Sequence, residues 1–533
     1  MSGQAPWWRG AAIYQIYIRS FADGNADGIG DFAGLISKLD YVASLGVDAV
    51  WLSPIHPSPN RDWGYDVSDY DAVNPEYGTA ADFDRLLVEA HARGLKVLTD
   101  EVLAHTSDEH AWFRDALGGG DKADWYVWAA PREDGTPPNN WLSAFAGPAW
   151  SYHPARRQYY HHKFLRQQPK LNWRNPAARA AALAVLNRWL ARGVDGFRLD
   201  VANAYFHDES LTDNPPVPQS QRSPYHWAHA PNLQFHFHDS NLLDNIEALD
   251  AIRRTVERYP DRFVMGEFSE EPGRSGCFAS SEKGLHSGYS FALLEAHTLA
   301  PDFVRRHYAM LAEHPEHWPS IAFSNHDVVR TLTRFGGTDA PPALAQMLLA
   351  LLFTLRGTAL LYQGEELGLP QVDLRRDQLR DPVGDLYYPL HTGRDGCRTP
   401  MPWDAAAPNL GFSTATPWLP AAEEHRALAV SDQERRTDSS LNWARRVLAL
   451  RKNSRALRQG EIEFLDAPAP LLAFLRTYED ETVVCVFNMS AQDAAFSYPK
   501  VGEFMLLANT PKTFAGSGEV LALPPFGVWV ARN

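Results

Sequence analysis

Cysteine is scarce in this chain of 533 residues. Only Cys277, Cys397 and Cys485 occur, and they are far apart, odd in number and without the spacing of metal ligands. The sequence therefore predicts neither a disulfide framework nor a cysteine-based metal site. Few and unpaired cysteines are typical of a reducing compartment, so we expect a cytoplasmic protein.

A long hydrophobic run is also lacking. The most apolar stretch, Leu348–Leu355, is flanked by Gln346 and Arg356. It is too short to cross a bilayer and predicts a buried helix instead. Residues Met1–Ser20 contain no basic start followed by an apolar run, so we expect no signal peptide. Together these features predict a protein that does not associate with a membrane.

Positive charge is in the minority, since the formal net charge is −15. This balance argues against nucleic acid as a partner, because binding to phosphates is driven by Lys and Arg. The length predicts two or three domains. Aromatic residues are plentiful, with 17 Trp and 20 Tyr. Flat apolar rings fill cores and also suit sugar rings. Nothing in the sequence predicts the oligomeric state.

A repeated order of elements runs through the chain: an amphipathic helix, a glycine, and then a short apolar strand. Examples are Ala80–Arg93 followed by Lys96–Asp100, and Pro176–Arg192 followed by Gly196–Val201. Glycine just past a helix end favours the left-handed cap. This alternation predicts βα units and a parallel sheet. We expect eight strands: Ala12–Ile18, Ala49–Leu52, Lys96–Asp100, Gly196–Val201, Phe263–Phe268, Gly288–Leu293, Ile321–Ser324 and Thr358–Tyr362.

Eight parallel strands over this length predict an α/β fold, a closed (β/α)8 barrel of the TIM type. A doubly wound sheet is the alternative, but its first strand should lead into a glycine-rich turn. Here the first strand leads into Arg19-Ser20-Phe21. Two regions break the repeated order, which predicts four segments: barrel (1–104), a small inserted domain after the third strand (105–172), the rest of the barrel (173–457), and a C-terminal all-β domain (458–533).

Acidic residues stand at the ends of four predicted strands: Asp100, Asp200, Glu267 and Asp327. Any one of them could simply cap the following helix. Four in register are more informative, because barrel enzymes place their chemistry at the carboxyl ends of the strands. The set therefore predicts an active site built from carboxylates.

Two facing carboxylates suit glycoside hydrolysis, and a separation of about 5 Å gives retention of configuration. Arg198 lies two residues before Asp200, so both side chains should point to the same side of the strand. A neighbouring guanidinium should keep Asp200 ionised, as a nucleophile requires. Apolar neighbours of Glu267 should raise its pKa, which suits a general acid/base.

Four segments resemble the conserved regions of the α-amylase superfamily, glycoside hydrolase family thirteen. They are Asp100–His105, Gly196–Asp200, Gly266–Glu267 and Ser324–Asp327. The resemblance covers essentially the whole chain. It implies that Asp200 is the nucleophile, Glu267 the acid/base and Asp327 the acid that stabilises the transition state.

Further segments resemble the oligo-1,6-glucosidase and α-glucosidase branch, and most of all proteobacterial α-glucosidases. They include Ile13–Tyr17, Gly64–Asp66 and Gly393–Asp395. In that branch the residues that match Asp66 and Arg394 close the pocket around one terminal glucose. Without the resemblance, the two would be interpreted as a turn residue and a surface ion pair. The substrate-binding residues implied are Tyr65, Asp66, His105, Phe164, Arg198, His326 and Arg394.

A loop after the first strand places oxygen-bearing side chains at alternate positions, as calcium loops do. The predicted ligands are Asp23, Asn25, Asp27, the carbonyl of Ile29, and Asp31. The alternative is an ordinary polar turn. We expect a structural calcium ion, with magnesium as a second possibility, and no organic cofactor.

Three positions depart from the pattern of the family. Ala104 stands where Asn is usual, and Lys170 replaces the acid of a short motif, Gln168–Asn172. Val201, just after the nucleophile, is typical of α-1,6 cleavage, whereas other segments resemble α-1,4 enzymes. The sequence therefore leaves the linkage preference open.

The leading hypothesis is an exo-acting, retaining α-glucosidase that acts on short α-glucosides such as maltose, isomaltose or sucrose. We expect the enzyme to bind one terminal glucose at a time and also to transfer glucose to other sugars. A glucosyltransferase or isomerase of the same fold is the alternative. A non-enzymatic relative, such as an amino-acid-transporter heavy chain, should carry a membrane anchor and lack catalytic acids. This sequence has no such anchor and keeps all three acids.

Overall fold

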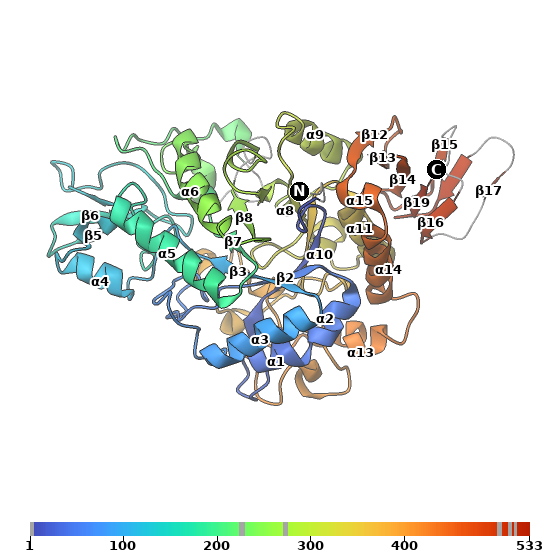
Figure 1. Cartoon of the computed structure of the whole chain (residues 1–533), viewed down its shortest axis with the longest axis horizontal. Helices are drawn as coiled ribbons and strands as arrows, with labels where there is room; N and C mark the ends of the chain where they lie inside the picture. Colours follow the sequence, from blue (N-terminus) through green and yellow to red (C-terminus); the bar gives the residue numbers. More distant parts are fainter. Residues whose placement is uncertain are drawn as a thin grey trace.

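The computed structural model describes residues 5–222, 230–269, 276–497, 504–509, 514–515 and 520–532. Its centre is an eight-stranded parallel sheet with the order β10-β11-β1-β2-β3-β7-β8-β9 (Figure 1). The strands are β1 (Ala12–Ile16), β2 (Ala49–Leu52), β3 (Lys96–Glu101), β7 (Gly196–Leu199), β8 (Phe263–Phe268), β9 (Ser287–Ser290), β10 (Ser320–Ala322) and β11 (Thr358–Tyr362).

The two outermost strands of this order, β9 and β10, meet through side chains. Ser287 donates from its hydroxyl to the carbonyl oxygen of Trp318 at 2.7 Å, and its oxygen lies 2.8 Å from the hydroxyl of Ser320. These contacts bring the ends of the sheet together, and the predicted (β/α)8 barrel is confirmed.

Helices surround the barrel and begin and end as their sequences predict. Asn175 caps α5 by accepting from the backbone N–H groups of Ala177 and Ala178, and Gly193 ends the helix in the left-handed conformation. The helices are α1 (Phe32–Ser37), α2 (Leu39–Leu45), α3 (Ala80–Ala92), α5 (Pro176–Arg192), α6 (Ile246–Val256), α8 (Phe291–Leu294), α9 (Pro301–Leu311), α10 (Thr331–Gly336), α11 (Pro342–Thr354), α12 (Pro382–Tyr387), α13 (Val430–Gln433), α14 (Ser440–Lys452) and α15 (Arg455–Gln459).

The apolar residues Leu35, Leu39 and Val42 predict a single helix over Ala33–Leu45, and here the structure differs. The stretch Ala33–Leu45 forms two helices, α1 and α2, because Lys38 leaves the helical conformation (φ −110°, ψ 3°). The amphipathic pattern continues across this break, so periodicity alone could not reveal it.

Alternate residues of each barrel strand face opposite sides. Tyr14 and Val50 pack toward the helices, whereas Ile13 and Trp51 fill the barrel interior. This period of two also decides where the charged residues point. Glu267 follows the interior residue Met265 by two positions, so it faces the barrel axis at the carboxyl end of its strand.

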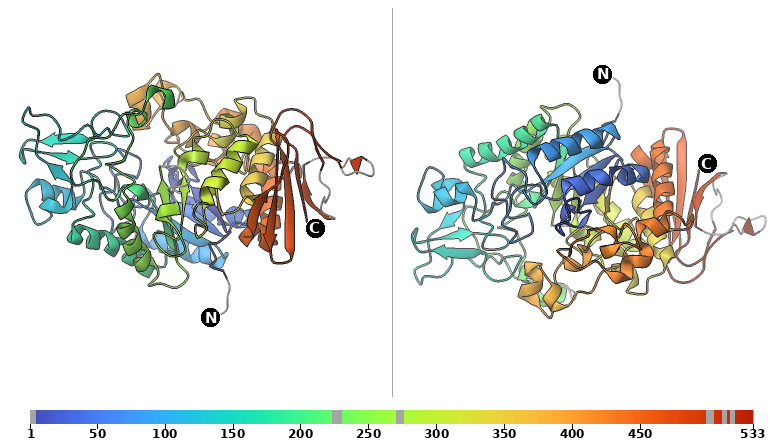
Figure 2. Two further views of the ribbon diagram at one scale, coloured as in Figure 1. Left: turned by 90° about the horizontal axis from the view of Figure 1, so that it is seen from above. Right: turned by 90° about the horizontal axis from the view of Figure 1, so that it is seen from below.

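Two smaller β units flank the barrel at opposite ends of the molecule (Figure 2). One lies within residues 105–172 and consists of α4 (Ala111–Leu117), β4 (Trp128–Ala129), β5 (Trp150–His153) and β6 (Gln158–His161). The other is C-terminal and consists of β12 (Glu461–Phe464), β13 (Leu471–Tyr478), β14 (Glu481–Asn488), β15 (Ala494–Ser497), β16 (Phe504–Ala508), β17 (Phe514–Ala515), β18 (Val520–Leu523) and β19 (Val528–Arg532).

No helix within the described ranges combines the length and apolar character that crossing a bilayer requires.

Candidate active site

A cavity of about 320 Å³ opens at the carboxyl ends of the barrel strands. Its lining contains three of the acids predicted from the strand ends, Asp200, Glu267 and Asp327, together with apolar side chains such as those of Phe291, Leu294 and Val328. The predicted site residues that line it are Tyr65, His105, Phe164, Asp200, Glu267, Asp327 and Arg394.

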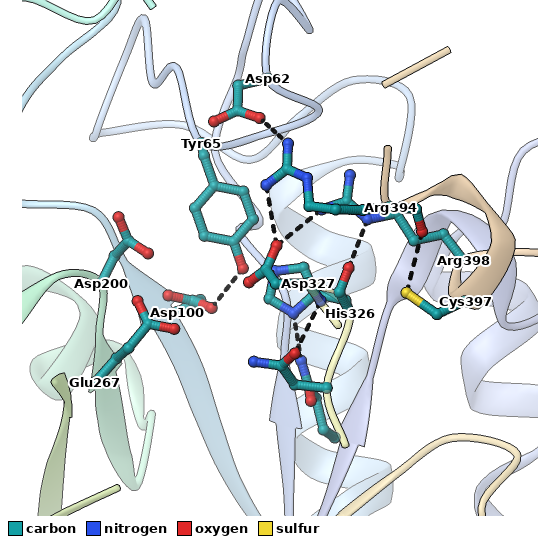
Figure 3. Close-up of polar contacts among 12 residues, drawn as sticks. Asp62, Tyr65, Asp100, Asp200, Glu267, His326, Asp327, Arg394, Cys397 and Arg398 are labelled. Carbon is teal, nitrogen blue, oxygen red and sulfur yellow. Dashed lines mark hydrogen bonds and ion pairs between the residues drawn. The ribbon is translucent and has the colours of Figure 1, made fainter. Parts of the chain in front are cut away.

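One guanidinium group holds the two central acids. Arg198 donates from Nη1 to Oδ1 of Asp200 at 2.8 Å, and its Nη2 forms an ion pair with Oε1 of Glu267. Arg198 and Asp200 are two residues apart, so the pleat directs both side chains inward as predicted. Asp200 and Glu267 lie next to each other in Figure 3. The arrangement brings both carboxylates to the same point of the cavity.

Arg198 also binds Asp100, with Nη1 donating to Oδ1 at 2.7 Å. It donates in addition to the hydroxyl of Tyr289, which in turn donates to Oε1 of Glu267 at 3.1 Å. A single buried cation therefore serves three carboxylates.

This sharing corrects one expectation. Arg198 was predicted to favour the ionised form of Asp200 alone, but it contacts Glu267 as well. Burial raises the pKa of Asp200 and of Glu267, and the attraction of Arg198 does not cancel that effect. The charge of Asp200 also raises the pKa of Glu267, and the charge of Asp100 raises the pKa of Asp200. The acids therefore titrate together rather than as one ionised and one protonated group.

The backbone after Asp200 also reaches Glu267. Val201 adopts a left-handed conformation (φ 45°, ψ 49°) and donates its N–H to Oε2 of Glu267 at 3.3 Å. This conformation is costly for a β-branched residue. Gly266 allows the close approach, because a Cβ there would lie 2.9 Å from Cβ of Ala202.

The third acid, Asp327, has a different environment. Its Oδ1 accepts from Nη1 of Arg394 at 3.0 Å and from Nη2 of Arg398 at 2.9 Å, and its Oδ2 lies 3.2 Å from Nε2 of His326. Burial acts to raise the pKa of Asp327, but His326 and the two arginines outweigh it and hold the pKa below its ordinary value. Asp327 is therefore a fixed negative charge.

Arg394 joins three carboxylates at the far side of the cavity. Besides Asp327, it donates from Nη2 to Asp62 at 2.7 Å and to Asp381 at 2.8 Å. Asp327 and Asp62 are labelled in Figure 3. Asp381 is fully buried and also accepts from the backbone N–H of Arg394 at 2.5 Å. It fixes the guanidinium from behind.

Asp66 and Arg394 were predicted to bind the same glucose, but the carboxylate that pairs with Arg394 is that of Asp62, four residues earlier. Asp66 is fully buried and is not among the described residues that line the cavity. Its carboxylate accepts from the hydroxyl of Ser58 at 2.7 Å and from the backbone N–H groups of Arg61 and Asp62, each at 3.0 Å. Asp66 therefore holds the turn that presents Asp62.

Tyr65 stands between the two groups of acids. Its hydroxyl donates to Oδ2 of Asp100 at 2.9 Å, and its ring stacks on His326 with centroids 5.2 Å apart. His326 therefore lies behind Tyr65, and neither it nor Arg198 lines the cavity within the described part of the chain. Both were predicted to bind substrate; the structure places them as supports for Tyr65 and for the acids.

His105 and Phe164 do line the cavity, with ring centroids 5.5 Å apart. Nε2 of His105 lies 2.9 Å from the carbonyl oxygen of Tyr65 and 3.3 Å from Nε2 of Gln168. Burial lowers the pKa of His105 to about 4, so its imidazole is neutral near pH 7.

Several residues of the site were not predicted from the sequence: Asp62, Gln168, Asp381 and Arg398. Asp62 had a signal, since it shares a five-residue segment with Asp66, but only the conformation of the turn decides which aspartate faces the cavity. Arg398 had a weaker one, because it lies four residues after Arg394.

The predicted metal loop forms a compact turn. Asp23 accepts through Oδ1 from the backbone N–H groups of Asn25 (3.0 Å) and Ala26 (2.7 Å), and Asp27 accepts from that of Ile29 (2.8 Å). Asp31 caps α1 by accepting from Gly34 at 2.6 Å. The described residues contain no group of three or more His, Cys, Asp or Glu arranged to hold a metal.

The oxygens of this loop are the hard ligands that calcium prefers. Burial raises the pKa of Asp31, and the charges of Asp23 and Asp27 add to the effect. A cation among these carboxylates would relieve that repulsion. The donor types fit calcium, and the metal site stays a prediction.

Residues 15–460 match the family model of the α-amylase catalytic domain, which is most of the chain. The chain belongs to the α-amylase family. Residues 462–530 match the C-terminal domain of maltogenic amylase. The resemblance on which the site residues were predicted is thereby confirmed, and the protein is a glycoside hydrolase.

Two relatives and one solved structure are similar to this chain over nearly its whole length. The chain is 48% identical over 504 residues to a probable α-glucosidase of Rhizobium meliloti (strain 1021), covering 92% of this chain and 91% of the relative. It is 35% identical over 543 residues to an oligo-1,6-glucosidase of Heyndrickxia coagulans, covering 95% and 96%. The crystal structure of an α-glucosyl transfer enzyme superposes with a TM-score of 0.95 at 47% identity, covering 99% of this chain and 100% of that one.

Proposed function

We propose that this member of the α-amylase family is an exo-acting, retaining α-glucosidase, which releases the non-reducing terminal glucose from short α-glucosides such as maltose, isomaltose or sucrose. The observation that carries the proposal is the pairing of Arg394 with Asp62 and Asp327 at one side of the cavity, opposite Asp200 and Glu267. Such a charged wall suits the hydroxyl groups of one terminal sugar.

In the first step, the carboxylate of Asp200 attacks the anomeric carbon while Glu267 gives its proton to the glycosidic oxygen that leaves. A covalent glucosyl–Asp200 ester results. In the second step Glu267, now ionised, takes a proton from water, and the oxygen of that water displaces Asp200. Two displacements return the original configuration. The binding of both carboxylates to Arg198 supports retention, because it keeps them close together.

Replacement of Asp200 tests this proposal. Asp200→Asn should lower the release of glucose from p-nitrophenyl α-glucoside by about 10⁴-fold or more, because the amide is a poor nucleophile. Turnover near that of the natural protein would refute the mechanism. A panel of maltose, isomaltose, sucrose, trehalose and nigerose would then give the linkage preference.

Transfer of the glucosyl group to a sugar is a second outcome of the same first step. The likeness to an α-glucosyl transfer enzyme favours it. Product chromatography at high maltose or sucrose separates the outcomes. New oligosaccharides would indicate transfer, an isomer of sucrose would indicate isomerisation, and free monosaccharides alone would exclude both.

We also propose a structural calcium ion in the loop that contains Asp23, Asn25, Asp27, Ile29 and Asp31. The support is the gathering of carboxylates described above. Removal of calcium by a chelator should lower the melting temperature by several degrees without changing KM, and Asp27→Ala should abolish the response to added calcium. An unchanged melting temperature would refute the metal site.

The location proposed for the protein is the cytoplasm. The support is the scarcity of cysteine in the sequence, which contains only Cys277, Cys397 and Cys485, far apart and odd in number. Cell fractionation with an antibody against the protein would test this.

A further inference from the structure

Lys170 is the residue for which the family pattern gave no explanation, and its environment is unusual. Its side chain is buried, and its ammonium group donates to the carbonyl oxygen of Ala204. Across the ranges that the structure describes, no carboxylate lies within ion-pair distance of it. An unpaired buried ammonium costs several kcal/mol. A cation that is buried at such a cost calls for a role other than a salt bridge.

The carbonyl that Lys170 binds belongs to the turn directly after the nucleophile. Ala202–Ala204 form one turn of 3₁₀-helix, and the N–H of Ala204 donates to the carbonyl oxygen of Val201 at 3.0 Å. The turn keeps Val201 in its left-handed conformation, with its N–H directed at Glu267. Because this conformation is strained, the turn needs support from its surroundings.

Two segments distant in sequence support the turn. From the barrel, Asn245 donates from Nδ2 to the carbonyl oxygen of Ala202 at 2.9 Å. From the inserted segment, Lys170 binds the other end of the turn at Ala204.

The same segment also supports the opposite wall of the cavity. Gln168, two residues before Lys170, donates from Nε2 to Oδ2 of Asp62 at 3.0 Å. The stretch Gln168–Lys170 thus contacts both walls of the cavity. On one wall it binds Asp62, which pairs with Arg394. On the other it binds the turn that reaches Glu267.

We propose that Lys170 is a positioning residue for Glu267: its ammonium group holds the turn at Ala204, and the turn aims the N–H of Val201 at the carboxylate. The inference rests on the proposed role of Glu267 as general acid/base. It gives a function to the cation that replaces the family's usual acid.

The consequence for chemistry follows from the hydrogen bond of Val201. An N–H that points at a carboxylate stabilises its ionised form, so this bond lowers the pKa of Glu267. Glu267 must be protonated to begin the reaction. Loss of the bond should therefore raise the pKa of Glu267 and move the alkaline limb of the kcat/KM profile to higher pH.

The charged groups around Lys170 must be considered in this test. Burial lowers the pKa of Lys170 to about 7, with Lys163 and Arg174 acting in the same direction and Asp239 against them. The charge of Lys170 in turn lowers the pKa of His105, His161 and His207. None of these groups is in hydrogen-bond contact with Glu267.

The test compares three variants with the natural enzyme, using glucose release from p-nitrophenyl α-glucoside between pH 4 and 10. Lys170→Met should lower kcat/KM by about fivefold to tenfold and move the alkaline limb upward. Lys170→Gln, which keeps an N–H donor, should restore part of both, and it carries the test if the Met variant does not fold. Lys163→Met is the matched control, because Lys163 binds Asp239 at 3.1 Å rather than the turn, and it should leave the limb in place.

A double substitution sharpens the test. Glycine adopts the left-handed conformation without strain, so the turn of Val201→Gly needs less support. Lys170→Met should then shift the limb less in the Val201→Gly background than in the natural one. Equal shifts in both backgrounds, or a fall in kcat/KM with no shift of the limb, would overturn the proposal.

A failure of the proposed function would be recognised separately, because the natural protein would then release no glucose. The crystal structure of Lys170→Met would still decide the role of Lys170. Departure of Val201 from the left-handed conformation is expected, and an unchanged turn would refute the inference.

Discussion

The two sides of the catalytic cavity contain similar residues but balance their charges differently. On one side, Arg198 is the cation shared by Asp100, Asp200 and Glu267. On the other, two cations serve three acids: Arg394 binds Asp62, Asp327 and Asp381, and Arg398 also binds Asp327. Tyr65 separates the two sides (Figure 3).

This difference divides the work of the site. Where three buried acids share one cation, full ionisation is unfavourable, and the pKa values of Asp200 and Glu267 rise. That side can hold and release a proton near neutral pH. Where two arginines bind the same acid, the pKa of that acid, Asp327, falls. That side carries a permanent charge pattern that can bind and orient a sugar.

Among the variants that compare the two sides of the cavity, the largest expected effect comes from removing the proton donor. Glu267→Gln should lower kcat/KM for maltose by about 10³-fold, because its leaving group needs a proton. The same variant should keep most of its kcat/KM with α-glucosyl fluoride, whose leaving group needs none. Steady-state rates on both substrates measure this, and an equal loss on the two would contradict the assignment of Glu267 to the proton-transferring side.

A smaller effect is expected on the side with fixed charges. Asp62→Asn should lower kcat/KM by about 10- to 100-fold, the value of a charged hydrogen bond, without moving the pH limbs. Asp66→Asn is the matched comparison: it should cost about 1–3 kcal/mol of stability and raise KM less than Asp62→Asn does. Kinetics and thermal unfolding of the two variants would distinguish them. If Asp66→Asn raised KM more than Asp62→Asn, the assignment of Asp62 rather than Asp66 to the cavity wall would be wrong.

The smallest effect is a shift of the pH profile. Asp200 must be ionised to react, so activity falls as the pH drops through the lower pKa of the pair; Glu267 must be protonated, so activity falls again as the pH rises through the higher one. The charge of Asp100 raises the pKa of Asp200. Asp100→Asn should therefore move the acid limb of kcat/KM to lower pH.

Asp381→Asn serves as the comparison for this shift, because Asp381 lies behind Arg394 on the other side. It should change KM and leave the acid limb in place. A shift of equal size in both variants would mean that the two sides are not electrostatically distinct.

The barrel and its converging acids could be predicted from the sequence, because strand periodicity and strand order are local properties. The interior residue Met265 fixes the direction of Glu267, and Arg198 and Asp200 share a side for the same reason. The family resemblance then assigned roles that geometry alone does not give.

What the sequence could not supply depends on loops and on contacts between distant segments. Two aspartates in one short turn, Asp62 and Asp66, are equivalent as letters, and only the folded turn separates the one that faces the cavity from the one that holds the turn. The contacts of Arg198 with Glu267 and of Lys170 with Ala204 join segments far apart in the chain. No local pattern encodes them.

The most direct test of the central claim is to trap the covalent intermediate. A 5-fluoro-α-glucosyl fluoride should transfer its sugar to the enzyme quickly, with loss of fluoride, and the adduct should hydrolyse slowly, so that the labelled peptide can be identified by mass spectrometry. The account predicts one glucosyl adduct on Asp200, formed by the natural enzyme and absent from Asp200→Asn. An adduct on another acid, or release of β-glucose as the first glucose product from p-nitrophenyl α-glucoside, would contradict it.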